Sequence, residues 1–197
     1  MWSRNLVLLF LSYVVFNQAL FIRHHRLGTK TNHLSLVDGN RVHKLVKRRI
    51  SDTNSNPKVL SDLHNLAGCS GEICGTLAGD AVAPLLAGAS ECAQQDMADR
   101  IIDSAKSQIK DSKVRAQMIQ LAITYRKTER NTFPDYNHQP PTDRNSLYCQ
   151  KSPKNFELNG IIQVQSPEAD PNLFFDPKST NGGGNVKKGT DLRASGN

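Results

Sequence analysis

Residues 69–130 decide the fold of this chain, and they read CSGEICGTLAGDAVAPLLAGASECAQQDMADRIIDSAKSQIKDSKVRAQMIQLAITYRKTER. They hold three of the four cysteines and three segments in which apolar residues recur at helical spacing. In the first segment the apolar residues are spaced by four, which predicts one ridge of a helix. They are Ile73, Leu77, Ala81 and Leu85.

The ends of this first helix are marked by residues with special backbone chemistry. Ser70 can cap its start by accepting from a free backbone N–H. Pro84 lacks the N–H that a continuous helix needs, so we expect a kink or restart there and a corner at Gly88. The many alanines and glycines of this segment would let a neighbouring helix come close. We expect Asp80 on an exposed edge.

A second helix is predicted after Ser90, our candidate for its cap. Its buried stripe consists of Met97, Ile101, Ile102, Ala105 and Ile109. Its opposite face consists of Asp96, Asp99, Asp103, Lys106 and Lys110. The three aspartates share a face, which raises the hypothesis of a divalent-metal site. We favour a solvated face on which Asp103 pairs with Lys106, because no second acidic cluster would complete a metal site.

A third helix is predicted after Asp111-Ser112, which breaks and recaps the chain. Its apolar residues are Val114, Met118, Leu121, Ala122 and Tyr125, the clearest amphipathic pattern in the sequence. The basic residues Arg126, Lys127 and Arg130 complement the negative end of that helix. Because the connections are short, we predict a mainly α fold, a small disulfide-stapled antiparallel helical bundle with a Pro-rich, largely irregular C-terminal tail.

The regions that flank the helices are polar and rich in turn-forming residues. We predict that residues 50–68 are a linker followed by a short helix, and that residues 69–177 are the cysteine-stapled domain with its anchored tail. Prolines exclude long elements after Asn131, so only Phe156 to Val164 is a candidate strand. Residues 178–197 are expected to be disordered.

Two adjacent aromatic residues stand out in this tail. Leu173, Phe174 and Phe175 lie between Pro171 and Pro177. We expect the aromatic pair to dock on the helices. The alternative is an exposed partner-binding patch.

Residues 1–19 have the build of a secretory signal, with Arg4 before an apolar run and a small residue, Ala19, at the expected cleavage position. The run is too short to span a bilayer core, which needs about 20 residues. We expect no membrane span in the mature protein, since no second apolar run follows.

Residues 20–49 are basic and end in Leu45-Val46-Lys47-Arg48-Arg49. Three interpretations remain open. Cleavage after the dibasic pair Lys47-Arg48, as by kexin-type proteases, would make residues 20–48 a propeptide. A nuclear-import patch formed by Lys44, Lys47, Arg48 and Arg49 would act if the protein entered a host cell. The third interpretation is a solvated linker.

The chain has a net charge of +7, but the excess lies in the basic segment. From Ile50 to Asn197 there are 16 basic and 17 acidic residues, so a nucleic-acid-binding core is disfavoured.

Four cysteines after a signal predict two disulfides among Cys69, Cys74, Cys92 and Cys149. A helix from Gly71 to Ala87 would place Cys74 roughly 20 Å from the corner before Cys92, too far for a bond. Two pairing schemes remain open, and both tie Cys149 to the helices.

The sequence contains no motif for catalysis or for a cofactor. Only His64 and His138 follow the basic segment, and neither has zinc-ligand spacing to a cysteine pair. No phosphate-binding loop or nucleotide fingerprint is present. We assign no catalytic residue, metal ligand or cofactor, and the sequence specifies no oligomeric state.

Four short stretches carry a resemblance to a known group of proteins. They are Glu91 to Asp99, Tyr125-Arg126, Tyr148 to Lys151 and Asn172 to Phe175. These stretches resemble uncharacterised four-cysteine small secreted proteins of fungi, including effector candidates of plant-infecting rusts. The resemblance implies a protein exported to bind a host protein and lower host defence, in the host cytoplasm or nucleus, and it implies no catalytic residue. The alternatives are a cell-wall structural protein and a small-ligand carrier with a pocket under the Ala/Gly-rich helix.

Overall fold

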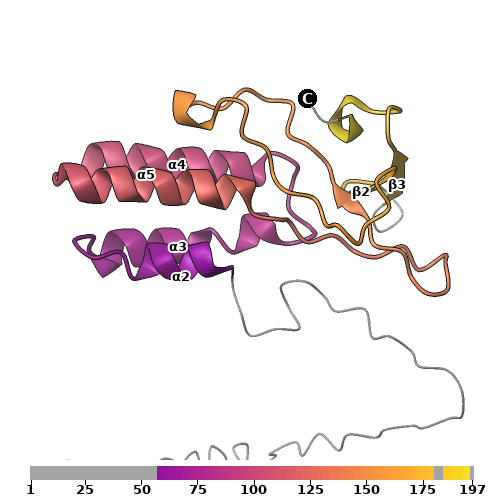
Figure 1. The fold of residues 1–197 in the computed structure, drawn as a ribbon, viewed down its shortest axis with the longest axis horizontal. Helices are drawn as coiled ribbons and strands as arrows, with labels where there is room; N and C mark the ends of the chain where they lie inside the picture. The colour runs from indigo at the N-terminus through magenta and orange to yellow at the C-terminus, as the bar shows by residue number, and fades with distance from the viewer. Residues whose placement is uncertain (1–56, 180–183, 196–197) are drawn as a thin grey trace, which may run out of the picture. The chain divides into compact units, whose positions relative to one another are not determined.

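The computed structural model describes residues 57–179 and 184–195. This part of the chain is mainly helical, with a small sheet and two disulfides (Figure 1). The helices are α2 Lys58–His64, the π-helix η2 Gly71–Gly75, α3 Thr76–Asp80, α4 Ala93–Gln108, α5 Ser112–Lys127, and the 3-10 helices η3 Ala83–Leu85, η4 Phe156–Leu158 and η5 Leu192–Ala194. The strands are β1 Asn145–Ser146, β2 Leu173–Asp176 and β3 Gly184–Lys187.

The first predicted helix is shorter than the sequence suggests. As expected, the Ser70 hydroxyl accepts a hydrogen bond from the Ile73 N–H at its start. Regular helix ends at Asp80, four residues before Pro84, and a 3-10 turn follows. The reason is that Pro84 has no N–H to donate to the Asp80 carbonyl, which a continued helix would require. The restart expected at Pro84 is thus a short 3-10 turn rather than a second length of helix.

Helices α4 and α5 pack side by side (Figure 1). The Asp111 carboxylate caps α5 by accepting from the N–H groups of Lys113 and Val114. Ser90 is not the cap of α4, because the chain makes a turn at residues 90–92 and Cys92 precedes the helix without a side-chain cap. Both predicted apolar stripes pack into one core, together with residues of α2 and α3. Its fully buried members include Ile101, Ile102, Met118 and Ala122.

The C-terminal region forms a three-stranded sheet in the order β1-β2-β3. β2 is central, parallel to β1 and antiparallel to β3. The strand predicted within Phe156 to Val164 is wrong, since that segment begins as the 3-10 helix η4 and continues without a strand. The expectation of a disordered tail over 178–197 is also wrong where the structure describes it, because residues 184–187 pair with β2 and residues 192–194 form η5.

The two disulfides join Cys69 to Cys74 and Cys92 to Cys149. This is one of the two schemes that the sequence left open. The Cys69–Cys74 bond closes a short local loop at the start of η2. The second bond links residues 57 positions apart and ties the C-terminal region to the start of α4.

Candidate binding groove

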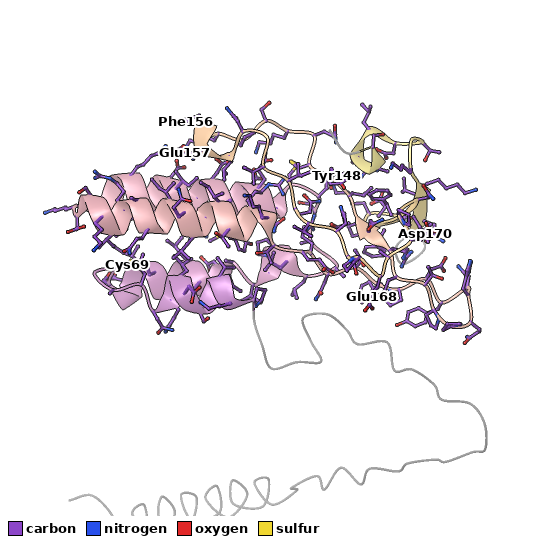
Figure 2. All side chains as sticks on the ribbon, viewed as in Figure 1. Cys69, Tyr148, Phe156, Glu157, Glu168 and Asp170 are labelled. Carbon is purple, nitrogen blue, oxygen red and sulfur yellow. A yellow bond between two sulfur atoms is a disulfide. The ribbon has the colours of Figure 1, made fainter. Side chains whose placement is uncertain are left out.

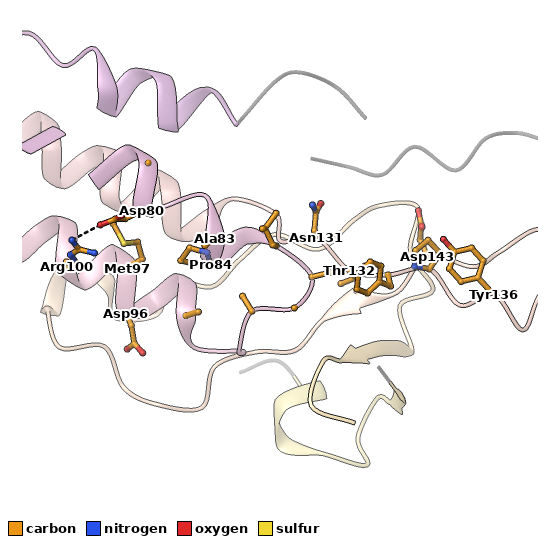
Figure 3. Close-up of a pocket in the computed structure, with 18 residues that line it drawn as sticks. Asp80, Ala83, Pro84, Asp96, Met97, Arg100, Asn131, Thr132, Tyr136 and Asp143 are labelled. Atoms are coloured by element: carbon orange, nitrogen blue, oxygen red, sulfur yellow. Dashed lines mark ion pairs between the residues drawn. The ribbon is translucent and has the colours of Figure 1, made fainter. Parts of the chain in front are cut away.

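An open groove of about 1170 Å³ lies where the chain leaves α3 and where it leaves α5. Its walls come from residues 83–89, from the first turns of α4 and from residues 131–136. The Asn131 N–H donates to the Leu85 carbonyl at 2.8 Å, which holds the two connecting segments together. Figure 3 shows the labelled Asp80 and Arg100 at one end of the groove and Tyr136 and Asp143 at the other.

Large apolar side chains stand exposed in this groove. The exposed fractions of Leu86, Phe133 and Tyr136 are 42, 49 and 63 per cent. Gly88 leaves room beside them, since an added Cβ there would meet no atom within 4 Å. Exposed aromatic and aliphatic groups that gather around a hollow are typical of a binding surface rather than of ordinary solvent-facing protein.

The groove also carries acidic groups. Three of its lining residues are aspartates, Asp80, Asp96 and Asp143, and one is a base, Arg100. Asp80 is exposed, as expected, and pairs with Arg100 at 2.7 Å. Asp96 pairs at 2.6 Å with Lys151, which does not line the groove. Because both of these aspartates are already paired, the lining offers a ligand mainly its exposed apolar groups.

The three aspartates of α4 bind the chain segment at residues 151–155 rather than standing free on a solvated face. Asp99 is buried, contrary to the sequence prediction, and its carboxylate accepts from the backbone N–H groups of Lys154 and Asn155 at 3.0 and 2.8 Å. Asp103 pairs with Lys154 and not with Lys106, and the hydrogen bond from Lys154 lowers the pKa of Asp103.

The neighbouring 3-10 helix η4 docks on the same side of the molecule. Lys106 pairs with Glu157 at 2.8 Å and lies over the Phe156 ring. Figure 2 shows Phe156 and Glu157 beside helices α4 and α5. The charged face of α4 therefore binds residues 151–157 of the same chain, although only Asp99 on it is buried. Among the described residues, no group of three or more His, Cys, Asp or Glu could hold a metal ion.

Arg126 is buried near the end of α5 and bonds to three glutamines. It donates to the side-chain oxygens of Gln163 at 2.8 Å, Gln94 at 3.3 Å and Gln95 at 3.4 Å. Burial, and to a lesser extent the charge of Arg130, lowers the pKa of Arg126 to about 10. The sequence assigned Arg126 only to the helix dipole. The buried guanidinium instead joins α4, α5 and the C-terminal region.

The hypothesis that Leu173, Phe174 and Phe175 form an exposed partner patch is wrong. Both phenylalanines are 3 per cent exposed, because β2 is the central strand. Phe175 packs edge-on against Phe133 with 5.5 Å between the ring centres, so it supports the groove from behind. The favoured expectation, docking of the pair on the helices, is not what the structure shows: the pair is buried, but Phe174 packs in the C-terminal cluster with Leu147 and Ala194, and Phe175 packs on Phe133.

Other predicted site residues fall outside the described part of the chain. These are Ala19, Lys44, Lys47, Arg48 and Arg49. The sequence singled out neither Phe133 nor Tyr136. The only sequence signal for the groove was the density of alanine and glycine before α4, which had raised the ligand-carrier alternative.

The chain matches no family model, no curated protein sequence and no solved structure. No helix in residues 57–179 and 184–195 is long and apolar enough to cross a membrane. Neither of the two histidines that the structure describes, His64 and His138, lines the groove.

Proposed function

We propose that this protein is a secreted, non-catalytic effector that binds a host protein through the groove and suppresses host defence. The observation that carries the proposal is the gathering of exposed Leu86, Phe133 and Tyr136 around a hollow of about 1170 Å³. Apolar anchors in a concave site supply most of the free energy in protein recognition. The two disulfides agree with an oxidising export route.

The proposed partner is a protein rather than a nucleic acid. The region from Ile50 onward is almost neutral in charge, and the lining of the groove contains three aspartates against one arginine. A surface with no excess of basic groups offers phosphate backbones little to bind. We also propose that α2 to α5 act as one disulfide-stapled bundle that presents the groove as a rigid unit, with the C-terminal region anchored against it.

The test compares two triple variants of the exported protein. Leu86→Ser, Phe133→Ser and Tyr136→Ser remove the apolar anchors of the groove. The matched control carries Phe156→Ser, Val164→Ser and Leu192→Ser, three side chains that are at least as exposed but lie outside the groove. Host proteins captured from plant tissue are identified, and each is then purified and titrated against all three proteins.

We expect a partner whose affinity falls at least about tenfold with the groove variant and stays unchanged with the control. The groove variant should also fail to lower the host oxidative burst when expressed in host cells. Equal binding and equal suppression by both variants would refute a role for the groove.

A second candidate function is a carrier of a small hydrophobic ligand. It is favoured by one observation: the Ala/Gly-rich segment before α4 forms a wall of the groove and leaves it wide. Mass spectrometry of an organic extract of the purified protein tests it. A stoichiometric hydrophobe that is absent from the groove variant would establish the carrier, and a clean extract would exclude it.

A further inference from the structure

One face of the three-stranded sheet packs against a wall of the groove. Residues directly opposite each other in neighbouring strands point to the same face of a sheet. Phe175 of β2 pairs with Asn185 of β3 and packs edge-on against Phe133, which lines the groove. Phe174 lies on the other face, in the small C-terminal cluster. Asn185 therefore lies on the face of the sheet that adjoins the groove.

Asn185 bonds to two buried charged groups on that face. Its side-chain Nδ2 donates to Asp135 Oδ2 at 2.7 Å, and its Oδ1 accepts from the Arg144 guanidinium at 2.8 Å. Asp135 and Arg144 are 4 and 5 per cent exposed, whereas Asn185 is exposed. The two partners fix the orientation of the amide, because a turned amide would place its donor against a guanidinium and its acceptor against a carboxylate.

Arg144 and Asp135 in turn hold the segment that carries the exposed aromatic residues of the groove. Arg144 donates to the carbonyls of Phe133 at 2.7 Å and Pro134 at 3.2 Å. Tyr136 follows Asp135 directly in the chain, and both aromatic residues line the groove. The backbone at residues 133–136 is thus tied to two charged groups that share one amide as a partner.

The order of this backbone matters for binding. Phe133 and Tyr136 are 49 and 63 per cent exposed, so their placement depends largely on the backbone that carries them. When a partner binds, exposed side chains and the loops beneath them lose conformational freedom, which opposes binding. A backbone that is already fixed reduces this cost and raises the affinity. A link that fixes residues 133–136 therefore favours binding in the groove.

We propose that Asn185 is a positioning residue of the groove, which acts through Asp135 and Arg144 to hold Phe133 and Tyr136 in the arrangement that a partner binds. Strand β3 thereby controls a surface formed by residues about 50 positions earlier in the chain. The inference rests on the proposed function for what the groove binds. The positioning itself is measured without any partner.

Exchange of the two polar groups tests the proposal in the exported protein. N185D keeps an acceptor for Arg144 but sets a second carboxylate against Asp135. D135N sets an NH₂ group against either the Asn185 donor or the Asn137 N–H. D135N/N185D restores one donor and one acceptor with their places exchanged, and it keeps the net charge of the parent. The control K187Q changes the net charge as N185D does, at an exposed residue on the same face of the same strand.

The readout is the hydrogen-exchange protection of the Asp135 and Thr142 amides, which bond to each other's carbonyls, relative to the amides of α5. We expect N185D and D135N each to lower this protection several-fold, because each breaks a hydrogen bond in which one partner is charged. D135N/N185D should regain most of the parent's protection, and K187Q should equal the parent. The affinity of a partner identified through the groove should follow the same order.

Several outcomes would overturn the proposal. Equal protection in the parent and all variants would show that the link does not order the segment. A double variant no better protected than the single variants would show that the two side chains do not act on each other. A loss shared by α5 would show general destabilisation, and a loss in K187Q equal to that in N185D would show an effect of charge.

The link between positioning and binding has its own test. Unchanged partner affinity in a variant with lowered protection would overturn it. Because hydrogen exchange needs no partner, the positioning is decided even where the groove variant keeps its host partner. The two proposals therefore fail separately.

Discussion

The helical region, residues 57–127, and the C-terminal region, residues 131–195, are held together by different forces. The helical region has a continuous core of buried aliphatic side chains from α2, α3, α4 and α5. The second buried cluster is small, with Leu147, Phe174 and Ala194 at its centre. In the C-terminal region buried polar residues are as numerous as buried apolar ones, and they include Asp135, Arg144, Asn145 and Gln163.

This contrast shows how a region with little apolar surface to bury keeps its shape. Apolar burial stabilises in proportion to area and needs no particular partner, whereas hydrogen bonds require specific partners at specific distances. The C-terminal region gains stability by bonding to the helices, through Cys92–Cys149, the Asp99 carboxylate and the Arg126 guanidinium. The following experiments test whether those three links stabilise the C-terminal region.

The largest effect is expected from removing the long-range disulfide. The double variant C92A/C149A should lower the free energy of unfolding by about 4 kcal/mol, because the bond closes a long loop. The matched variant C69A/C74A removes a bond between residues five positions apart and should cost about 2 kcal/mol. Denaturant unfolding of both variants measures the difference, and equal losses would show that the C-terminal region does not depend on its covalent tie.

The next largest effect is expected at Arg126. Arg126→Met leaves the side-chain oxygens of three buried glutamines without their shared donor and should cost about 3 kcal/mol. The neighbouring Lys127 is exposed, and Lys127→Met should change stability by less than about 0.5 kcal/mol. Urea unfolding tests the pair. Similar small losses from both would mean that the helical core alone sets stability.

Asp99→Ala should cost about 2 kcal/mol, since the N–H groups of Lys154 and Asn155 would lose their charged acceptor. Asp96 lies on the same helix but is half-exposed and pairs with a fully exposed lysine, so Asp96→Ala should cause no measurable loss. The two unfolding midpoints are compared under identical conditions. A cost at Asp96 equal to that at Asp99 would contradict the distinction between buried and exposed links.

The smallest effect is a local dependence on pH. The pKa of Asp103 is lowered by the hydrogen bond from Lys154, so its contribution is present above the unfolded pKa of 3.8. That contribution is lost as the pH falls through the lower folded pKa. Amide exchange at residues 151–158 should quicken on acidification below about pH 4, relative to α5. The variant D103N should show a smaller change over the same range, and an identical change would assign the effect to another group.

Sequence patterns predicted the helices well because their determinants are local. Val59, Leu60 and Leu63 mark α2, and the stripe ending at Tyr125 marks α5. The caps at Ser70 and Asp111 were also found, since a cap involves residues only two or three positions apart.

The sheet and the groove could not be found in this way. Strand β2 has no alternating pattern, and its partner β1 is two residues long and lies far away in the chain. Asp99 was assigned to solvent because its partners lie 55 and 56 positions along the chain. Phe133 and Tyr136 gained significance only when the Asn131 N–H met the Leu85 carbonyl and brought two loops together.

By itself the sequence determined where helices begin and run, that four cysteines form two bonds, and that the excess positive charge lies before Ile50. The tertiary structure alone decided which cysteines pair, which acid is buried and where apolar groups remain exposed. The physical reason is the distance along the sequence over which each interaction acts. Helical periodicity and capping act within a few residues, whereas a buried polar bond or a groove exists only where distant segments meet.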